Sequence, residues 1–172
     1  MPCFRGQRWM WDGVRFEMLH PRHDSYANPK VKTNDRGCVL KITSAHGSVL
    51  LTADIEARSE AELLATQSAA LASDVMLVPH HGSKTSSTPP FIAAVHPSLA
   101  IATPGYRNRL GHPRPEIIAR YREQNIPLLR SDFDGAVQIR FDGGPPRVRT
   151  WRAADVRYWR GRPLHEEAPA LE

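Results

Sequence analysis

The sequence predicts one α/β domain built on a mixed β-sheet. The 172 residues are enough for a single domain with its own core. Short apolar runs of strand length alternate with helical segments along the middle of the chain, which is typical of parallel β-α-β units. Paired strand-like segments near the N-terminus are joined by short turns, which favours antiparallel strands there.

The N-terminal part is expected to form two β-hairpins. Residues 6–21 predict two strands around the turn at Asp12 and Gly13. A polar loop with Pro, Asn and Asp follows at 22–37. Residues 38–43 and 48–53 then predict a second pair of strands.

The rest of the chain alternates between helices and strands. Ser59 followed by Glu62 has the spacing of a capping box, which predicts a helix from Ser59 to about Ala72. The last three strands are expected to complete the same sheet. The remaining elements are predicted, in order, as strand 74–79, helix 88–95, strand 99–103, helix 115–125 and strands 126–131, 135–141 and 147–151.

Composition narrows the class of protein. A hydrophobic content of 41% with 24% charged residues indicates a globular chain. No apolar run approaches ~20 residues, so no transmembrane helix is expected, and the N-terminus lacks the apolar region of a signal peptide. Direct membrane insertion by this chain is therefore not expected. The domain is expected over 1–160, with a flexible tail at 161–172.

The net charge of +5 and the pI of about 9.6 favour polyanionic partners such as nucleic acid. Arginines gather near the C-terminus with one acid, Asp155, among them. Two interpretations stay open, a solvated basic face and a track for a phosphate backbone. The arginines in question are Arg147, Arg149, Arg152, Arg157, Arg160 and Arg162.

The candidate metal ligands each come after a predicted strand. Asp54 follows 48–53, His81 follows 74–79, and His112 lies in the loop after 99–103. Strand ends in an α/β sheet are where a site forms, and Asp and His are common ligands of zinc and manganese. A purely structural role is the alternative for two of them: Asp54 as a carboxylate at a helix N-terminus near Arg58, and His112 as a turn residue.

His80 and His81 are candidate catalytic residues in the same turn. Adjacent histidines of an extended strand face opposite ways, so one can face the site while the other orients it. Which of the two would be a ligand stays open. Candidate phosphate-binding residues lie in the same loops and are Ser83, Lys84, Arg107 and Arg109.

These motifs resemble the metallo-β-lactamase superfamily, and more closely the C-terminal domain of the ComEC family of competence DNA-uptake channel proteins. The specific parts are SVLLTADIE, HHGSKTSS and GYRNRLGHP, within a resemblance over residues 2–160. It implies an α/β fold corresponding to the C-terminal half of an αββα sandwich. It also implies a dinuclear-metal phosphodiesterase or nuclease, with Asp54 as the bridging ligand, His112 as the late histidine ligand and zinc or manganese as cofactor.

The resemblance implies partners and a location as well. Single-stranded DNA would be the substrate, and the membrane channel portion of the parent protein would be a partner. The parent domain would lie in the periplasm or at the extracytoplasmic face of the inner membrane.

The sequence departs from the family at its main metal motif, because no His-x-Asp-x-Asp-His cluster occurs in the 172 residues. We therefore expect the chain to represent the second half of the domain, with an N-terminal half as its missing partner. Weak metal binding and little activity are expected. The alternatives are a non-catalytic basic DNA-binding module and a structural remnant.

Two structural expectations follow. The residues alone leave buried thiols and a disulfide both open for Cys3 and Cys38, with free thiols slightly favoured. The location that the resemblance implies is one where a Cys3–Cys38 disulfide would persist. Loss of a covering half is expected to expose an apolar patch next to Asp54, formed by Val39, Leu40, Ile42, Leu50 and Val75.

Overall fold

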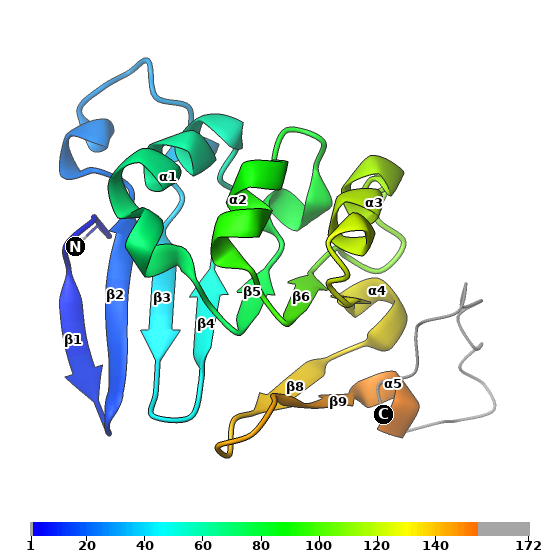
Figure 1. Cartoon of the computed structure of the whole chain (residues 1–172). Coiled ribbons are helices and arrows are strands. Elements are labelled where there is room, and N and C mark those ends of the chain that lie inside the picture. The colour runs from blue at the N-terminus through cyan, green and yellow to red at the C-terminus, as the bar shows by residue number, and fades with distance from the viewer. Residues whose placement is uncertain (1, 155–172) are drawn as a thin grey trace.

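The computed structural model describes residues 2–154, in which seven strands form one mixed sheet (Figure 1). Their order in the sheet follows their order in the chain. Strands β1 to β4 pair antiparallel, and β4 to β7 pair parallel. The strands are β1 (Arg8–Trp11), β2 (Val14–His20), β3 (Val39–Thr43), β4 (Ser48–Leu51), β5 (Val75–Leu77), β6 (Leu99–Ala102) and β7 (Leu128–Arg130). The predicted α/β class is confirmed.

Three helices connect the parallel strands and lie on one face of the sheet (Figure 1). They are α1 (Ala57–Leu71), α2 (Pro89–Val95) and α3 (Pro115–Glu123). Two single-turn helices, α4 (Ser131–Asp134) and α5 (Trp151–Ala154), flank a separate two-stranded ribbon. Short 3-10 turns are η1 (His23–Tyr26), η2 (Asn34–Arg36) and η3 (Pro79–Gly82).

The ribbon consists of β8 (Val137–Arg140) and β9 (Arg147–Thr150). We predicted both strands, but their placement in the main sheet was wrong. Val137, Ile139 and Val148 pack against Val75 and Leu99 of the main sheet. The ribbon therefore covers the face of the parallel half that lies opposite the helices.

Strand alternation explains why this sheet has two apolar faces. Met76 and Ala100 belong to the core beneath the helices, whereas their neighbours Val75 and Leu99 belong to the cluster beneath the ribbon. Successive side chains of a strand point to opposite faces, so a strand covered on both sides is apolar throughout.

The prediction of an exposed apolar patch was wrong for three of its five residues. Val39, Leu50 and Val75 are fully buried, and only Leu40 and Ile42 remain half-buried. Val39 and Leu50 lie in the core beneath the helices, whereas Val75 lies beneath the ribbon. The prediction assumed one bare face, but the helices cover Val39 and Leu50 on one face and the β8–β9 ribbon covers Val75 on the other.

The predicted capping box was also wrong. Helix α1 begins at Ala57, so Ser59 is already inside it, and no side chain caps the N-cap residue Glu56. The Ser59 hydroxyl instead donates to the carboxylate of Asp35 at 2.7 Å. A contact with a residue 24 positions away took the place of the local capping interaction.

Glu60, next to Ser59, is fully buried and joins three segments. Its carboxylate accepts the backbone N–H groups of Ser87 (2.5 Å) and Thr88 (2.8 Å). Arg120 of α3 donates to the Ser87 carbonyl at 2.9 Å, and the hydroxyls of Ser87 and Tyr121 lie 3.2 Å apart. Burial raises the pKa of Glu60 above its ordinary value, against the opposing effect of these N–H groups. Glu60 thus anchors the loop after η3 to α1 and α3.

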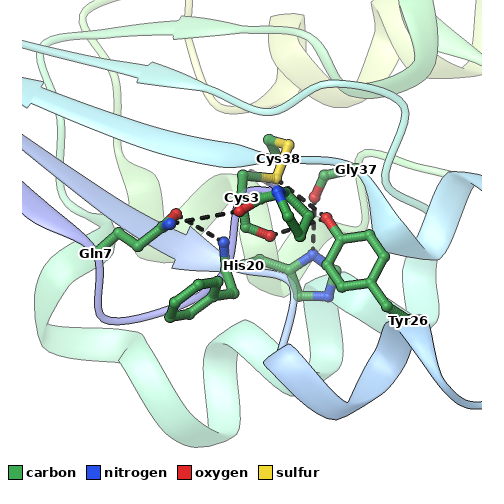
Figure 2. The surroundings of a disulfide bond; sticks show 8 residues. Cys3, Gln7, His20, Tyr26, Gly37 and Cys38 are labelled. Carbon is green, nitrogen blue, oxygen red and sulfur yellow. Dashed lines mark hydrogen bonds between the residues drawn. A yellow bond between two sulfur atoms is a disulfide. The ribbon is translucent and has the colours of Figure 1, made fainter.

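Cys3 and Cys38 form a disulfide, with Cα atoms 6.0 Å apart and a sequence separation of 35 (Figure 2). The possible bridge is therefore confirmed, and the slight preference for free thiols was wrong. The Tyr26 hydroxyl donates to the Cys3 carbonyl at 2.8 Å, and His20 Nδ1 lies 3.0 Å from the Gly37 carbonyl. The bridge ties the N-terminal segment to the start of β3.

No helix within residues 2–154 has the length and hydrophobicity needed to cross a bilayer. The predicted tail at 161–172 lies outside the described residues, as do Arg157, Arg160 and Arg162.

Removal of the disulfide should destabilise the fold. We expect the double substitution Cys3→Ser, Cys38→Ser to lower the free energy of unfolding by about 2–4 kcal/mol, because a long loop is no longer closed in the unfolded chain. Urea denaturation followed by circular dichroism measures this. The wild-type chain under reducing conditions should match the double variant, and equal midpoints for oxidised and reduced protein would contradict the prediction.

Replacement of the buried carboxylate should also be costly. We expect Glu60→Gln to lower the free energy of unfolding by about 1–3 kcal/mol, since the amide turns N–H groups toward a backbone donor and leaves it unpaired. Glu62→Gln, on the same helix and partly exposed, is the matched control and should change stability by less than about 0.5 kcal/mol. Equal losses in the two variants would reject the anchoring role.

Candidate functional site

The predicted site residues gather at the edge where the parallel strands end. Asp54 follows β4, His80 and His81 lie in η3 just after β5, and His112 lies in the loop between β6 and α3. Because β4, β5 and β6 are parallel, their carboxyl ends meet at one edge of the sheet. The predicted convergence at one rim is confirmed by the contacts that follow.

The backbone at this edge is strained. Ala53, His80 and His81 have φ values of 50°, 51° and 55°, in the left-handed region that non-glycine residues avoid. Each such residue costs on the order of 1 kcal/mol and persists only where its surroundings hold it. Here the His80 N–H donates to the Ala53 carbonyl at 3.0 Å, which joins the two strained turns. Strain of this kind concentrates at functional sites.

Gly82 brings the His112 loop against the histidine turn. Its φ is +85°, and a Cβ atom there would lie only 2.7 Å from the Cα of Pro113. Arg114 N–H donates to the Gly82 carbonyl at 2.9 Å, and the His80 and His112 rings lie 6.2 Å apart. A glycine is therefore required both for the turn and for the close approach.

Asp54 and His81 form the central pair. His81 Nε2 lies 3.5 Å from Asp54 Oδ1, and both side chains are about half exposed. The other ring nitrogen of His81 lies 3.2 Å from the Thr103 hydroxyl at the end of β6. The pair therefore presents an oriented imidazole and a carboxylate to solvent.

His80 is held by protein groups on both ring nitrogens. Asn34 Nδ2 lies 3.4 Å from His80 Nε2 and also 3.4 Å from the Glu56 carboxylate. Because an amide nitrogen only donates, Nε2 accepts this bond in the tautomer that carries its proton on Nδ1. Nδ1 faces the Thr85 hydroxyl at 3.3 Å. Of the two histidines, the geometry favours His81 as the one that shares a ligand or substrate with Asp54.

His112 contributes a buried imidazole nitrogen. Its Nδ1 has no hydrogen-bond partner within residues 2–154, although Asn108 pairs with both its main-chain N–H (2.8 Å) and its carbonyl (2.9 Å). Burial lowers the pKa of His112 below its usual value, and the nearby Arg114, His80 and His81 lower it further. The ring is therefore neutral at neutral pH and keeps its basic lone pair.

The predicted phosphate-binding residues divide into two kinds. Ser83 is buried, and its hydroxyl lies 3.2 Å from that of Thr85. Lys84, Arg107 and Arg109 are exposed at the same edge. Their role stays a prediction.

Glu56 and Thr103 are site residues that the sequence pattern did not reveal. Glu56 accepts from Lys32 at 3.2 Å as well as from Asn34. The only signal was position, because Glu56 is two residues after Asp54 and Thr103 directly follows a buried strand.

The donors fit a divalent cation in type but not in number. Asp54 and His81 are ordinary ligands of zinc and manganese, and a metal centre needs three or more protein ligands. Among residues 2–154, no three His, Cys, Asp or Glu side chains surround one point. Asp54 and His81, 3.5 Å apart, are the described donors placed to share one cation.

Comparison with known proteins gives relatives but no family model that matches the chain. Competence protein ComA of Neisseria gonorrhoeae is 36% identical over 158 residues, which cover 92% of this chain and 22% of that protein. Recombination protein 2 of Haemophilus influenzae is 31% identical over 139 residues, 81% of this chain and 17% of that protein. ComE operon protein 3 of Bacillus subtilis is 31% identical over 137 residues, 80% of this chain and 17% of that protein.

The chain thus spans about a fifth of the length of these relatives. The similarity extends over most of the residues that form the sheet and its site edge. Homologues with these names support the assignment of this chain to a competence-related family.

Proposed function

We propose that this chain contributes one side of a phosphodiester-hydrolysing site in a protein that handles DNA during natural competence. The observation that carries this proposal is the Asp54–His81 pair at 3.5 Å, set beside His80 and His112 on one strained edge. An imidazole next to a carboxylate is suited to general acid-base work on a hydrolytic reaction.

The surroundings suit an anionic substrate. His112 stays neutral, so its lone pair remains available as a base or ligand. Lys84, Arg107 and Arg109 are exposed cations at the same edge, and cations close to a phosphodiester stabilise the charge that develops there.

The resemblance to the metallo-β-lactamase superfamily supports a hydrolase with zinc or manganese. In two-metal hydrolases the ions activate water and stabilise the leaving oxygen. The described donors are too few for such a centre, so we derive no step through a metal and propose that further ligands come from polypeptide outside this chain.

The proposal includes a setting outside the cytoplasm. The Cys3–Cys38 disulfide supports it, because disulfides persist in the periplasm and at the cell surface. The proposed partners are single-stranded DNA and the membrane channel portion of a longer competence protein.

A second function, DNA binding without cleavage, is favoured by one observation. The outer face of the β8–β9 ribbon bears three exposed arginines, Arg140, Arg147 and Arg149. These cations belong to other elements than the Asp54–His81 pair, so they can contact phosphates without taking part in hydrolysis.

Metal titration tests the proposed half-site. We expect calorimetric titration of Zn²⁺ or Mn²⁺ into the 172-residue chain to show one weak site, because two donors hold a cation loosely. Asp54→Asn and His81→Gln should each abolish it. His46→Gln, in the exposed turn between β3 and β4, is the control and should leave it unchanged. Undiminished binding in Asp54→Asn would reject the shared site.

A nuclease assay follows from the same geometry. Cleavage of a single-stranded oligonucleotide by this chain should stay near background with either metal, since the ligand set is incomplete. Two tight metal sites together with rapid cleavage, lost in His81→Gln, would show that the donors are complete within the chain.

A further inference from the structure

The positive charge of the chain is concentrated in its last described third. Residues 104–154 contain ten arginines, no lysine and five acidic residues, and thus account for the whole net charge of +5. This stretch includes the loop that carries His112 and the β8–β9 ribbon.

The outer face of the ribbon is cationic. Val137, Ile139 and Val148 point toward the sheet, so the alternate residues point outward. All four of the outward residues are exposed, and none is acidic. They are Gln138, Arg140, Arg147 and Arg149.

The arrangement of these arginines is unfavourable for the ribbon alone. Arg140 and Arg147 are directly opposite one another across the two strands. Like charges in that position destabilise a strand pair. Asp142 forms an ion pair with Arg147 at 3.0 Å, whereas no acidic partner of Arg140 or Arg149 is seen within residues 2–154. A bound polyanion would relieve the repulsion.

An exposed aromatic ring joins the ribbon to the site loop. The guanidinium groups of Arg107 and Arg152 each lie 5.3 Å from the centre of the Tyr106 ring. Arg152 belongs to α5, which directly follows β9, and Tyr106 lies six residues before His112. Tyr106 and Trp151 are 67% and 52% exposed. The cationic surface therefore continues from β9 to the loop that carries His112.

We propose that this surface, formed by Arg140, Arg147, Arg149, Tyr106 and Trp151, binds single-stranded DNA and leads it toward the Asp54–His81 edge. The arginines contact phosphates, and the two aromatic rings stack on bases. The proposal rests on the proposed function for the choice of single-stranded DNA as the polyanion, and it adds the surface that contacts it.

The exposed rings decide in favour of a single strand. Bases of a duplex are stacked on one another, so only unpaired bases offer a face to Tyr106 or Trp151. Stacking between a base and an aromatic side chain is independent of sequence, because every base has a π-face. We therefore expect little dependence on base composition and a strong dependence on salt.

The experiment is a fluorescence-anisotropy titration of the full chain with labelled oligothymidylate of about 15 nucleotides, a length within the range of single-strand sites. Tyr106→Ala should weaken binding about fivefold or more, and Tyr106→Phe should restore it because the ring is kept. The pair Arg140→Gln, Arg149→Gln should weaken binding and reduce the slope of log affinity against log salt by about 1.4.

Two controls match these variants. Arg15→Gln removes an exposed charge from β2, and Trp11→Ala removes an exposed ring from β1; both strands lie at the side of the sheet away from β7 (Figure 1). Both should bind like the wild type.

Three outcomes would overturn the proposal. They are equal affinity for a duplex of the same length, no loss in Tyr106→Ala, and preferential binding of the chain to phosphatidylserine vesicles. The metal titration reports on Asp54 and His81 and the DNA titration on the ribbon, so either proposal can fail alone.

Discussion

Burying a carboxylate is unfavourable in free energy unless its oxygens accept hydrogen bonds. The hydrogen bonds that Glu60 requires for this reason fix a neighbouring loop in place. Its two oxygens take up two backbone N–H groups of the loop after η3, and Arg120 holds the same loop through a carbonyl. The loop that follows the histidine turn is thereby fixed between two helices. The left-handed backbone at His80 and His81 can persist because its continuation is anchored in this way.

The site combines rigid support with an open face. Asn34 and Thr85 hold His80, Thr103 orients His81, and Gly82 draws the His112 loop into contact. The Asp54 and His81 side chains at its centre are about half exposed to solvent. Side chains preorganised by their neighbours lose little freedom when a ligand binds, so the cost of assembling the site is paid during folding.

Short-range sequence patterns correctly predicted the structural elements that are determined by neighbouring residues. Alternation and turn residues identified the seven strands of the main sheet, and strand ends identified Asp54, His81 and His112, because parallel strands bring their ends together. Contacts between residues far apart in the sequence could not be predicted from these short-range patterns. Ser59 bonds to Asp35 instead of capping a helix, and β8–β9 fold back as a separate layer over Val75. Asn34, one of the two residues that hold His80, lies 46 positions away in the sequence, so local pattern could not predict this contact.

The bridge between Cys3 and Cys38 makes a covalent ring that encloses β1, β2 and the exposed loop after them. Exposed loops are where proteases cut most readily. A single cut after Arg22 or Lys30, both exposed, would leave the two pieces of chain joined through sulfur, with both strands still paired in the sheet. Such nicked protein would migrate as one species until a reductant is added. The ring thus makes the N-terminal hairpin inseparable from the rest of the domain wherever thiols remain oxidised.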